Sequence, residues 1–314
     1  MPRPAFSAFV FGFVLDFRRE VVYKGTKPRR TRLILSPVIT SRQNDAVKRA
    51  RALANGKNLA ASSLMLVEGV RLIEDSLVEG IRYDTVLVCP RLESTERGAA
   101  LRESLLRSGN PVLDATDAVL ASISDVAGDQ CVAGLAYKKI WKLEHLLPAA
   151  GPALVAVAWG VQDPGNLGTI IRTADAAGAT GVVAAAHSAC PWNPKCIRGT
   201  MGSIFRLPVI EADLRAGAHR ENTLKILEEL RRHKLQLIGT SVTAETRHTD
   251  VDFTKPAAII LGGEGAGVPD AINGLCDATL RIPLRREVES LNVASAAAII
   301  LYEAARQRRF AGLV

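Results

Sequence analysis

The chain has 314 residues, of which 40 are Lys or Arg and 32 are Asp or Glu, so its formal net charge is +8. A single hydrophobic core stops growing beyond roughly 250–300 residues, and this length therefore favours two domains and a tail. The basic excess is compatible with a polyanionic partner. Aromatic residues make up only 5% of the chain, which argues against recognition by rows of stacked rings and favours phosphate contacts and shape.

The number and spacing of the cysteines indicate the cellular compartment and limit the metal sites that we expect. The five cysteines are odd in number and widely spaced, which is typical of a reducing compartment and not of a disulfide framework, so we expect a cytoplasmic protein. His187, Cys190 and Cys196 are close in sequence, but they include no Cys-x-x-Cys pair and no fourth ligand for a closed zinc site. We therefore predict no metal.

Residues 1–37 differ from the rest of the chain. Five of the eight phenylalanines fall here, in an apolar run too short to span a membrane, followed by a basic stretch from Lys24 to Arg32. No A-x-A-like cleavage site follows the run, which argues against a secretory signal. We interpret this part as a poorly ordered N-terminal extension, or as the product of a mis-assigned start codon, and we predict no membrane association.

Residues 38–138 read as a small α/β module. Its first element is a capped, basic amphipathic helix that carries Lys48, Arg49 and Arg51, for which a solvated surface face is the simplest alternative use. The other expected elements are a strand from Leu64 running into a helix from Val70 to Glu79, a strand from Thr85 to Cys89, a short strand at 112–113, a helix around Ala115 to Ile123, and a strand from Cys131 to Tyr137.

Residues 139–152 read as a linker, because a charged segment is followed by a stretch with Pro148, Gly151 and Pro152 that stops the preceding element. In residues 153–314 short apolar strands alternate with helices, which predicts a mostly parallel sheet covered on both faces. The clearest of these elements are strands Ala153 to Trp159, Val182 to Ala185, Leu235 to Gly239 and Ala257 to Leu261, and a helix from Asn222 to His233.

Three polar motifs interrupt this second part. In the first, Asp163 to Gly178, a Gly-rich turn enters a helix, so that Asn166 can cap the helix or reach into a cleft, and the free N–H groups offer an anion site. Arg172 lies in an otherwise apolar stretch of small residues. An ion pair with Asp175 at i,i+3, worth about 0.2–0.5 kcal/mol, is its simplest alternative role.

The second motif, Ala257 to Asp270, is a strand followed by a Gly-rich turn whose glycines let the backbone approach a ligand closely. Its spacing fails as a dinucleotide fingerprint, because Val268 takes the place of the last glycine, and it lacks the Gly-Lys-Ser/Thr of a P-loop. In the third motif, Ile282 to Arg309, a polar turn joins a strand to a small-faced helix that Ser290 or Asn292 can cap.

The three motifs in this order resemble the SpoU (TrmH) branch of the SPOUT RNA methyltransferases, whose third motif has the form Ile-Pro-Met, a turn, Ser-Leu-Asn-Val and an alanine-rich helix. Leu284 stands where Met is usual, and Arg286 stands where Gly is common. Between the first two motifs, residues 193–208 resemble the family's basic connection, with Thr200 in place of the usual serine. The likeness covers roughly Val38 to Arg309.

The resemblance implies a trefoil-knotted α/β methyltransferase domain over residues 153–314, with a smaller N-terminal α/β domain, similar to a ribosomal protein, that grips RNA. It implies a homodimer, S-adenosylmethionine (AdoMet) as cofactor, and methyl transfer to a ribose 2′-hydroxyl of RNA, with ribosomal RNA favoured over transfer RNA. Carried over by position, the catalytic residues are Asn166, Arg172, Glu264, Ser290 and Asn292. The cofactor-binding residues are Thr240, Gly262, Gly263, Gly265, Ile282, Leu284, Ser290, Leu291 and Asn292. The RNA-binding residues are Asn44, Lys48, Arg51, Lys195 and Arg198.

The chemistry of these side chains limits their roles. An arginine is a poor base because its pKa exceeds about 12, so we expect Arg172 to orient the substrate phosphate and to stabilise the developing alkoxide. Asn166, Ser290 and Asn292 supply neutral hydrogen bonds for positioning, and Glu264 more plausibly holds loops together than acts as a base. The alternatives are a transfer RNA methyltransferase and a catalytically silent RNA-binding protein of the same fold; a dinucleotide-dependent oxidoreductase is disfavoured by the glycine spacing.

Overall fold

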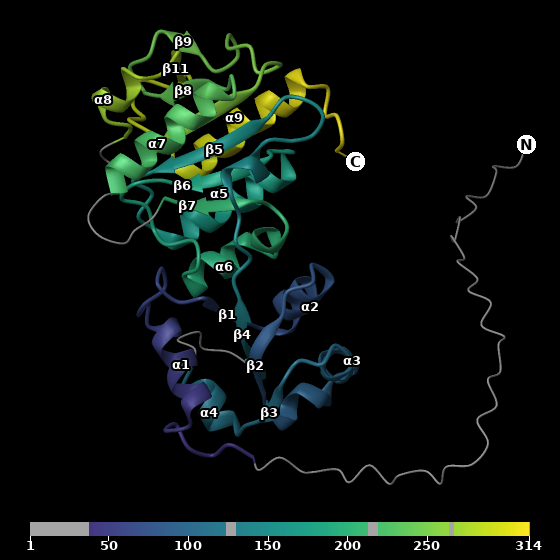
Figure 1. Ribbon diagram of the computed structural model, residues 1–314. Coiled ribbons are helices and arrows are strands. Elements are labelled where there is room, and N and C mark those ends of the chain that lie inside the picture. The colour runs from purple at the N-terminus through teal and green to yellow at the C-terminus, as the bar shows by residue number, and fades with distance from the viewer. Residues whose placement is uncertain (1–37, 124–129, 213–218, 264–266, 314) are drawn as a thin grey trace, which may run out of the picture. The chain divides into compact units, whose positions relative to one another are not determined.

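The computed structural model describes residues 38–123, 130–212, 219–263 and 267–313 (Figure 1). The predicted N-terminal extension, residues 1–37, lies outside the described residues, as do Glu264 and Gly265 of the second motif. The described residues contain a four-stranded and a seven-stranded sheet. No helix within these ranges is both long and apolar enough to cross a membrane.

The four-stranded sheet has the order β1-β4-β2-β3, with β4 antiparallel to both of its neighbours and β2 parallel to β3. Its strands are β1 (Leu64–Glu68), β2 (Tyr83–Val88), β3 (Val112–Asp114) and β4 (Val132–Tyr137). The accompanying helices are α1 (Asp45–Ala54), α2 (Val70–Val78), the 3-10 helix η1 (Pro90–Ser94), α3 (Glu96–Arg107) and α4 (Asp117–Ala121). The predicted α/β module is therefore confirmed, although α3 was not expected from the sequence.

The seven-stranded sheet has the order β7-β6-β5-β10-β8-β11-β9, and all of its pairings are parallel, which confirms the prediction of a mostly parallel sheet. Its strands are β5 (Leu154–Trp159), β6 (Gly181–Ala184), β7 (Val209–Glu211), β8 (Gln236–Thr240), β9 (Thr246–Arg247), β10 (Ala257–Gly262) and β11 (Ala278–Arg281). The helices are η2 (Leu143–Leu146), α5 (Pro164–Ala176), α6 (Pro194–Thr200), η3 (Ser203–Phe205), α7 (His219–Arg232), α8 (Asp270–Asn273) and α9 (Val293–Gln307).

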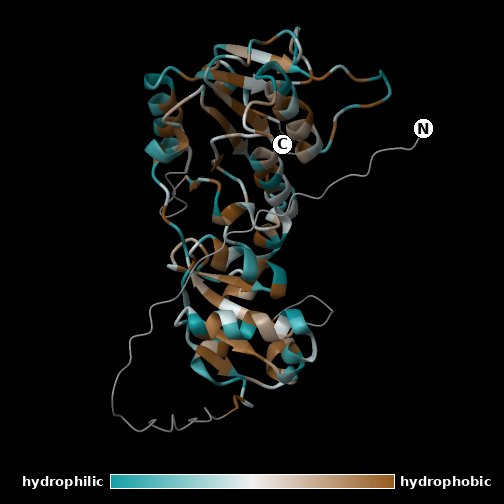
Figure 2. Cartoon of the chain, turned by 90° about the vertical axis from the view of Figure 1, so that its right-hand side faces the viewer, coloured by the Kyte–Doolittle hydropathy of each residue, from teal (hydrophilic) through white to brown (hydrophobic). Residues whose placement is uncertain are grey.

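Both faces of this sheet are covered, as the apolar strands predict. Every residue of β5 is buried, and its side chains alternate between two cores. Ala156 and Ala158 pack in the core that contains residues of α5 and α9, whereas Val155 and Val157 pack in the core that contains residues of α7. Figure 2 shows the strands largely in brown, the colour of hydrophobic residues. Continuous apolar strands are the expected pattern for a parallel sheet buried on both sides.

Helices α5 and α6 approach each other closely because two glycines face each other. A Cβ atom on Gly168 of α5 would lie 2.5 Å from the carbonyl oxygen of Cys196 and 3.0 Å from the Cα of Gly199, both in α6. No side chain fits in that space. The close contact fixes α6 against the helix of the first motif, so that side chains on α6 are placed relative to Asn166.

Helix α6 also contacts β1 of the four-stranded sheet. The Arg198 guanidinium donates to the Glu68 carboxylate at 2.6 Å, and the Glu68 side chain is only 2% exposed. Nearby, Gly202 has a φ of +91°, and a Cβ there would lie 2.9 Å from a carboxylate oxygen of Asp75 in α2. Glu68 is the last residue of β1, directly before the turn into α2.

The C-terminal end of α9 is tied to the starts of two central strands by one side chain. Arg308 donates to four backbone carbonyl oxygens, those of Pro152, Ala153, Phe253 and Lys255, at 2.8–3.1 Å. The preceding Gln307 donates to the Val251 carbonyl and accepts from the Phe253 N–H. A planar guanidinium with five N–H donors is the side chain that suits such a set of carbonyls.

We predict that Arg308→Lys lowers the free energy of unfolding by about 2 kcal/mol or more, because an ammonium cannot reach four carbonyls and leaves some of them without a donor. Arg309→Lys is the matched control, since Arg309 is exposed, and it should change stability by less than about 0.5 kcal/mol. Guanidinium chloride unfolding of both variants makes the comparison. Equal midpoints for the two variants would contradict the role given to Arg308.

Candidate functional site

Strand order locates a site before any side chain is considered. From β5 the chain runs outward through β6 and β7, and β8 and β10 then lie on the other side of β5, so the order reverses between β5 and β10. In open parallel sheets, ligands bind beyond the carboxyl ends of the strands at such a switch point. The first motif follows β5, and the Gly-rich turn of the second motif follows β10.

A pocket of about 480 Å³ lies beyond the carboxyl ends of β8, β10 and β11 and reaches the start of α9. Its volume is within the range of small-molecule sites, roughly 300–1,000 Å³. Seven of the nine predicted cofactor residues line it: Thr240, Gly262, Gly263, Ile282, Leu284, Ser290 and Leu291. Of the other two, Gly265 lies outside the described residues, and Asn292 stands at the edge as the cap of α9.

The Gly-rich turn has no room for side chains. A Cβ on Gly263 would lie 1.8 Å from the carbonyl oxygen of Gly160, and a Cβ on Gly262 would lie 2.3 Å from backbone atoms of Gly267 and Val268. The Gly263 N–H donates to the Trp159 carbonyl at 2.7 Å. The turn after β10 is therefore packed directly on the loop after β5, and bare backbone forms this part of the pocket wall.

A hydrogen bond between two asparagines joins the first and third motifs. The Asn292 side-chain amide donates to the Asn166 Oδ1 at 3.0 Å. The Asn292 Oδ1 also accepts from the N–H groups of Ala294 and Ser295, so Asn292 is the N-cap of α9, one of the two predicted alternatives. The predicted capping role of Asn166 is wrong, because Asp163 caps α5 by accepting from the Asn166 N–H at 2.9 Å.

Arg172 is not part of the pocket wall. It lies six positions after Asn166 along α5, and at about 100° per residue the two side chains point from different faces of the helix. Arg172 is exposed and forms no ion pair with any described residue. The alternative pairing with Asp175 is wrong, since that carboxylate accepts from Arg206 and from the Ser203 hydroxyl.

The basic residues predicted to bind RNA on α6 both have acidic partners. The Lys195 ammonium donates to the Asp163 carboxylate at 2.5 Å. The pKa of Asp163 lies below its usual range, chiefly because of this bond and next because the carboxylate accepts from the Asn166 N–H. Arg198 is held by Glu68. Lys195 thus stays exposed beside the first motif, whereas Arg198 is one-third exposed and tied to β1.

The predicted RNA-binding residues of the N-terminal part all belong to α1 or its cap. Asn44 is the N-cap, and its Oδ1 accepts from the Ala46 N–H at 2.9 Å. Lys48 is exposed and lies 3.9 Å from Asp45. Arg51 is half-buried, and its Nε is buried without a hydrogen-bond partner among the described residues. Lys48 is the most available of the three to a phosphate.

Asn273 and Glu289 are two of the polar lining residues that were not among the predicted cofactor residues. Asn273 lines the pocket, donates to the Val268 carbonyl at 3.2 Å and so supports the Gly-rich turn. Its Oδ1 is buried without a hydrogen-bond partner among the described residues. Glu289 lines the opposite side. Glu289 could have been predicted, because it belongs to the polar cluster before α9. Asn273 could not, because nothing in the neighbouring sequence distinguishes it from an ordinary polar residue near a helix end.

The fold and the pocket define an α/β protein with a ligand-sized, glycine-walled pocket at the carboxyl edge of a parallel sheet. Residues 153–302 match the SpoU rRNA Methylase family. Residues 44–134 match the MRM3-like substrate binding domain. The two matched segments correspond to the seven-stranded and the four-stranded sheet.

Relatives of known name cover nearly the whole of the described chain. The 23S rRNA (guanosine(2553)-2′-O)-methyltransferase RlmP of Bacillus subtilis is 31% identical, over 84% of this chain and 97% of the relative. The AdoMet complex of the SpoU methyltransferase AviRb from Streptomyces viridochromogenes has a TM-score of 0.75 and 30% identity, over 85% of this chain and 99% of that chain. An AdoMet-bound rRNA methyltransferase from Sinorhizobium meliloti has a TM-score of 0.72 and 31% identity, over 86% and 97%.

The chain belongs to the SpoU rRNA methylase family. An uncharacterized tRNA/rRNA methyltransferase of Synechocystis is 33% identical, over 86% of this chain and 94% of the relative. The resemblance drawn from the three motifs is therefore confirmed, and so is the prediction of an α/β fold with an N-terminal substrate-binding domain. The oxidoreductase alternative is wrong.

We predict that Gly263→Ala disrupts the pocket, because the added Cβ would meet backbone atoms of Gly160 that cannot move aside alone. Gly267→Ala is the control in the same turn. Gly267 has a φ of +61° and open space around its Cβ position, so this change costs only about 1–2 kcal/mol of backbone strain. Thermal unfolding and AdoMet titration by calorimetry should show that Gly263→Ala loses the binding that Gly267→Ala retains. Normal AdoMet affinity in Gly263→Ala would show that the turn does not shape the site.

Proposed function

We propose that this protein is an AdoMet-dependent methyltransferase that methylates a ribose 2′-hydroxyl of ribosomal RNA. The observation that supports this most directly is the convergence of the second and third motifs on one glycine-walled pocket, beside the asparagine pair that links the third motif to the first. Family membership and the 23S rRNA methyltransferase names of its relatives support the substrate class.

The residues around the pocket suit the proposed cofactor. The bare backbone at Gly262 and Gly263 allows close approach, Leu261 and Ile300 offer apolar contact, and the Ser290 hydroxyl offers a hydrogen bond. Small-molecule sites combine apolar walls with placed polar groups, and this pocket has both kinds of lining in similar measure. When bound, AdoMet supplies a methyl group on a sulfonium that is already strongly electrophilic. The protein then has to align the acceptor hydroxyl and assist loss of its proton.

The proposed catalytic roles divide between positioning and charge. Asn166 and Asn292 form a rigid neutral pair at the first turns of α5 and α9, and Ser290 adds a hydroxyl near them. Arg172 orients the substrate phosphate and stabilises the developing alkoxide. Since an arginine does not deprotonate at ordinary pH, proton uptake falls to a phosphate or water near it. We assign Glu264 to holding loops together.

The position of Arg172 supports a two-subunit site. Its side chain points from a different face of α5 than Asn166, so within one chain it does not approach the pocket. We propose a homodimer in which the partner contributes this arginine, built on α9, where Ile299 and Tyr302 are 38% and 46% exposed. We also propose that residues 153–314 form a trefoil-knotted domain. A linker at 139–152 joins this domain to an RNA-binding domain at 38–138, and the protein is cytoplasmic.

The reaction is tested by incubating the purified protein with methyl-labelled AdoMet and separate pools of unmodified ribosomal and transfer RNA. We expect label on 2′-O-methylated nucleosides from the ribosomal pool after nuclease digestion. Label from the transfer RNA pool alone would replace the proposed substrate. If the protein binds AdoMet but transfers no label to either pool or to ribosome assembly intermediates, a catalytically silent RNA-binding protein is favoured.

Arg172→Ala tests the charge role. We expect methyl transfer to fall at least about 100-fold, because one preorganised donor at a developing oxyanion is worth roughly that much, while AdoMet affinity stays within about twofold. Arg232→Ala is the control, since Arg232 is an exposed arginine on α7. Single-turnover rates and calorimetric titration separate the two effects. An unchanged rate in Arg172→Ala would remove this residue from the mechanism.

A further inference from the structure

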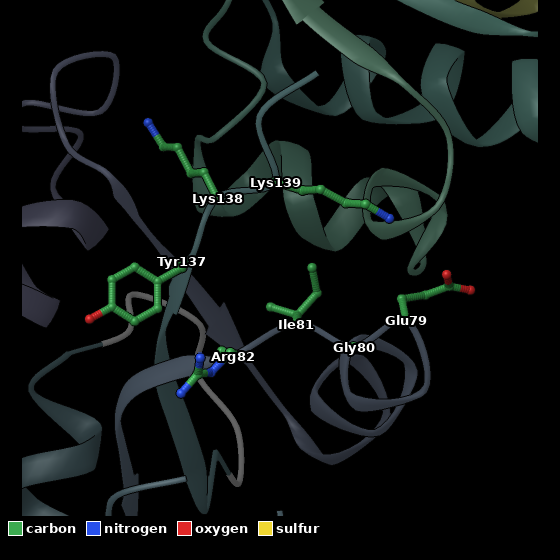
Figure 3. Close-up of a pocket in the computed structure, with 7 residues that line it drawn as sticks. All are labelled: Glu79, Gly80, Ile81, Arg82, Tyr137, Lys138 and Lys139. Carbon is green, nitrogen blue, oxygen red and sulfur yellow. The ribbon is translucent and has the colours of Figure 1, made fainter. Parts of the chain in front are cut away.

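A second pocket, of about 460 Å³, lies where β4 of the N-terminal sheet leaves for the linker (Figure 3). Its wall consists of residues 79–82 and 137–139, which include three cationic side chains and one acidic one. None of these residues belongs to the AdoMet pocket or to the RNA-binding set predicted from the sequence. The excess of positive charge favours an anionic ligand.

The aromatic side chain that lines this pocket is exposed, although its backbone is hydrogen-bonded within the sheet. Tyr137 is 48% exposed although it ends a strand whose other residues are buried. Its backbone N–H donates to the Arg82 carbonyl at 2.9 Å. Because residues opposite each other on antiparallel strands project from the same face, the Tyr137 ring and the Arg82 side chain lie together, as Figure 3 shows.

A polar cluster beside the pocket reaches α1. Arg49 of α1 pairs with the Asp84 carboxylate at 2.8 Å. The pKa of Asp84 is lowered, first by the hydrogen bond from Arg49, against the effect of burial, with smaller contributions from hydrogen bonds of Thr85 and Tyr137. The Arg49–Asp84 pair joins this part of the sheet to the basic helix predicted to contact RNA.

The cations of the pocket differ in how available they are. The Lys138 ammonium donates to the Leu59 carbonyl and lies 5.3 Å from the centroid of the Trp192 ring, so it is engaged within the protein. The Lys139 ammonium lies 4.4 Å from the Trp141 ring centroid and 3.5 Å from the Phe205 carbonyl oxygen, a long contact. Arg82 is exposed and forms no ion pair in the described part of the chain.

We propose that this pocket holds an unpaired nucleotide of the RNA substrate, with the base stacked on the Tyr137 ring and the flanking phosphates bound by Arg82 and Lys139. The proposal rests on the proposed function for the identity of the nucleic acid. RNA-binding proteins recognise single-stranded loops and bulges by stacking splayed bases on aromatic rings and arginine planes, and they neutralise phosphates beside them. An exposed ring next to an exposed guanidinium that has no acidic partner among the described residues provides both contacts.

The test compares ring and hydroxyl at one position in the full chain. Binding of a fluorescein-labelled single-stranded RNA 12-mer, and of the same strand in a duplex, is followed by fluorescence anisotropy. We expect Tyr137→Leu to weaken binding of the single strand by roughly fivefold to 100-fold, the range for loss of one base stack. Tyr137→Phe, which keeps the ring, should stay within about threefold, and the duplex should be indifferent to both changes. Equal single-strand affinities for Tyr137→Leu and wild type would overturn the proposal.

The phosphate contacts are tested separately, by the salt dependence of RNA binding. Each of Arg82→Gln and Lys139→Gln should reduce the slope of log K against log salt concentration by about 0.7, the value for one phosphate on a single strand. Arg232→Gln on α7 is the control and should leave the slope unchanged. A slope unchanged in both pocket variants would remove the phosphate half of the proposal.

Crosslinking and turnover separate this inference from the proposed function. In the wild-type protein, photo-crosslinking of a 4-thiouridine-substituted RNA should label the peptide that contains Tyr137; labelling confined to other peptides would count against the pocket. In the methyltransfer assay, Tyr137→Leu should raise KM for the RNA while kcat and AdoMet affinity persist. An unaltered KM, with active wild-type enzyme, overturns the pocket and leaves the proposed function standing. If the wild-type protein is inactive but its RNA binding still depends on the Tyr137 ring, the proposed function is overturned and the pocket proposal stands.

Discussion

The hydrogen bond from Asn292 to Asn166 is the contact on which the candidate site depends. Asn292 caps α9 and Asn166 lies in the first turn of α5, so one bond fixes the starts of the two helices that pack on the same face of the sheet. Asn292 uses its oxygen for the helix and its amide for the bond, and a side chain with only acceptors could do the first but not the second. The two helices start at the carboxyl ends of β5 and β11, and the Gly-rich turn after β10 packs on the loop that leads into α5. The residues that line the pocket all lie between positions 240 and 300, and they are held in place by contacts with Gly160 and Asn166, each more than 100 residues away from its partner in sequence.

Contacts through α6 connect this site to the N-terminal sheet. The glycine contact at Gly168 and Gly199 fixes α6 on α5, Lys195 reaches the Asp163 cap of α5, and Arg198 reaches the buried Glu68 of β1. A buried carboxylate that loses its partner is costly, so the Glu68–Arg198 pair constrains how β1 meets α6 more than it adds net stability. The part of the chain that resembles a substrate-binding domain is thus joined by one short helix to the first motif.

The sequence was informative where structure is decided locally. Continuous apolar runs predicted the buried strands of the parallel sheet, and the order of the three motifs predicted which residues would gather. Helix α3 was missed because only Gly98, Leu101 and Leu105 of its residues are buried, and most of its other residues are charged or exposed. The cap of α5 was assigned to the wrong residue because Asp163 and Asn166 are both good caps, and Pro164 at the first helical position decides in favour of Asp163. Strand order and the pairing of Arg198 with Glu68, 130 residues away, depend on long-range packing that no local pattern encodes.

The same long-range pairing changes how the net charge of +8 should be understood. Arg49, Lys195, Arg198 and Arg206 each face a carboxylate, and these pairs orient loops and helices within the protein. Arg172 and Arg82, in contrast, are exposed and have no acidic partner among the described residues. An exposed guanidinium without a partner has lost none of its capacity for a phosphate, since no internal bond has to be broken first. Recognition of a polyanion by this chain is therefore better inferred from which cations remain unpaired than from how many there are. By that criterion Arg172 on the first-motif helix and Arg82 near the end of β4 are candidates for holding an RNA backbone, together with Arg71, Arg247, Arg285 and Arg286, which are exposed and likewise have no acidic partner among the described residues.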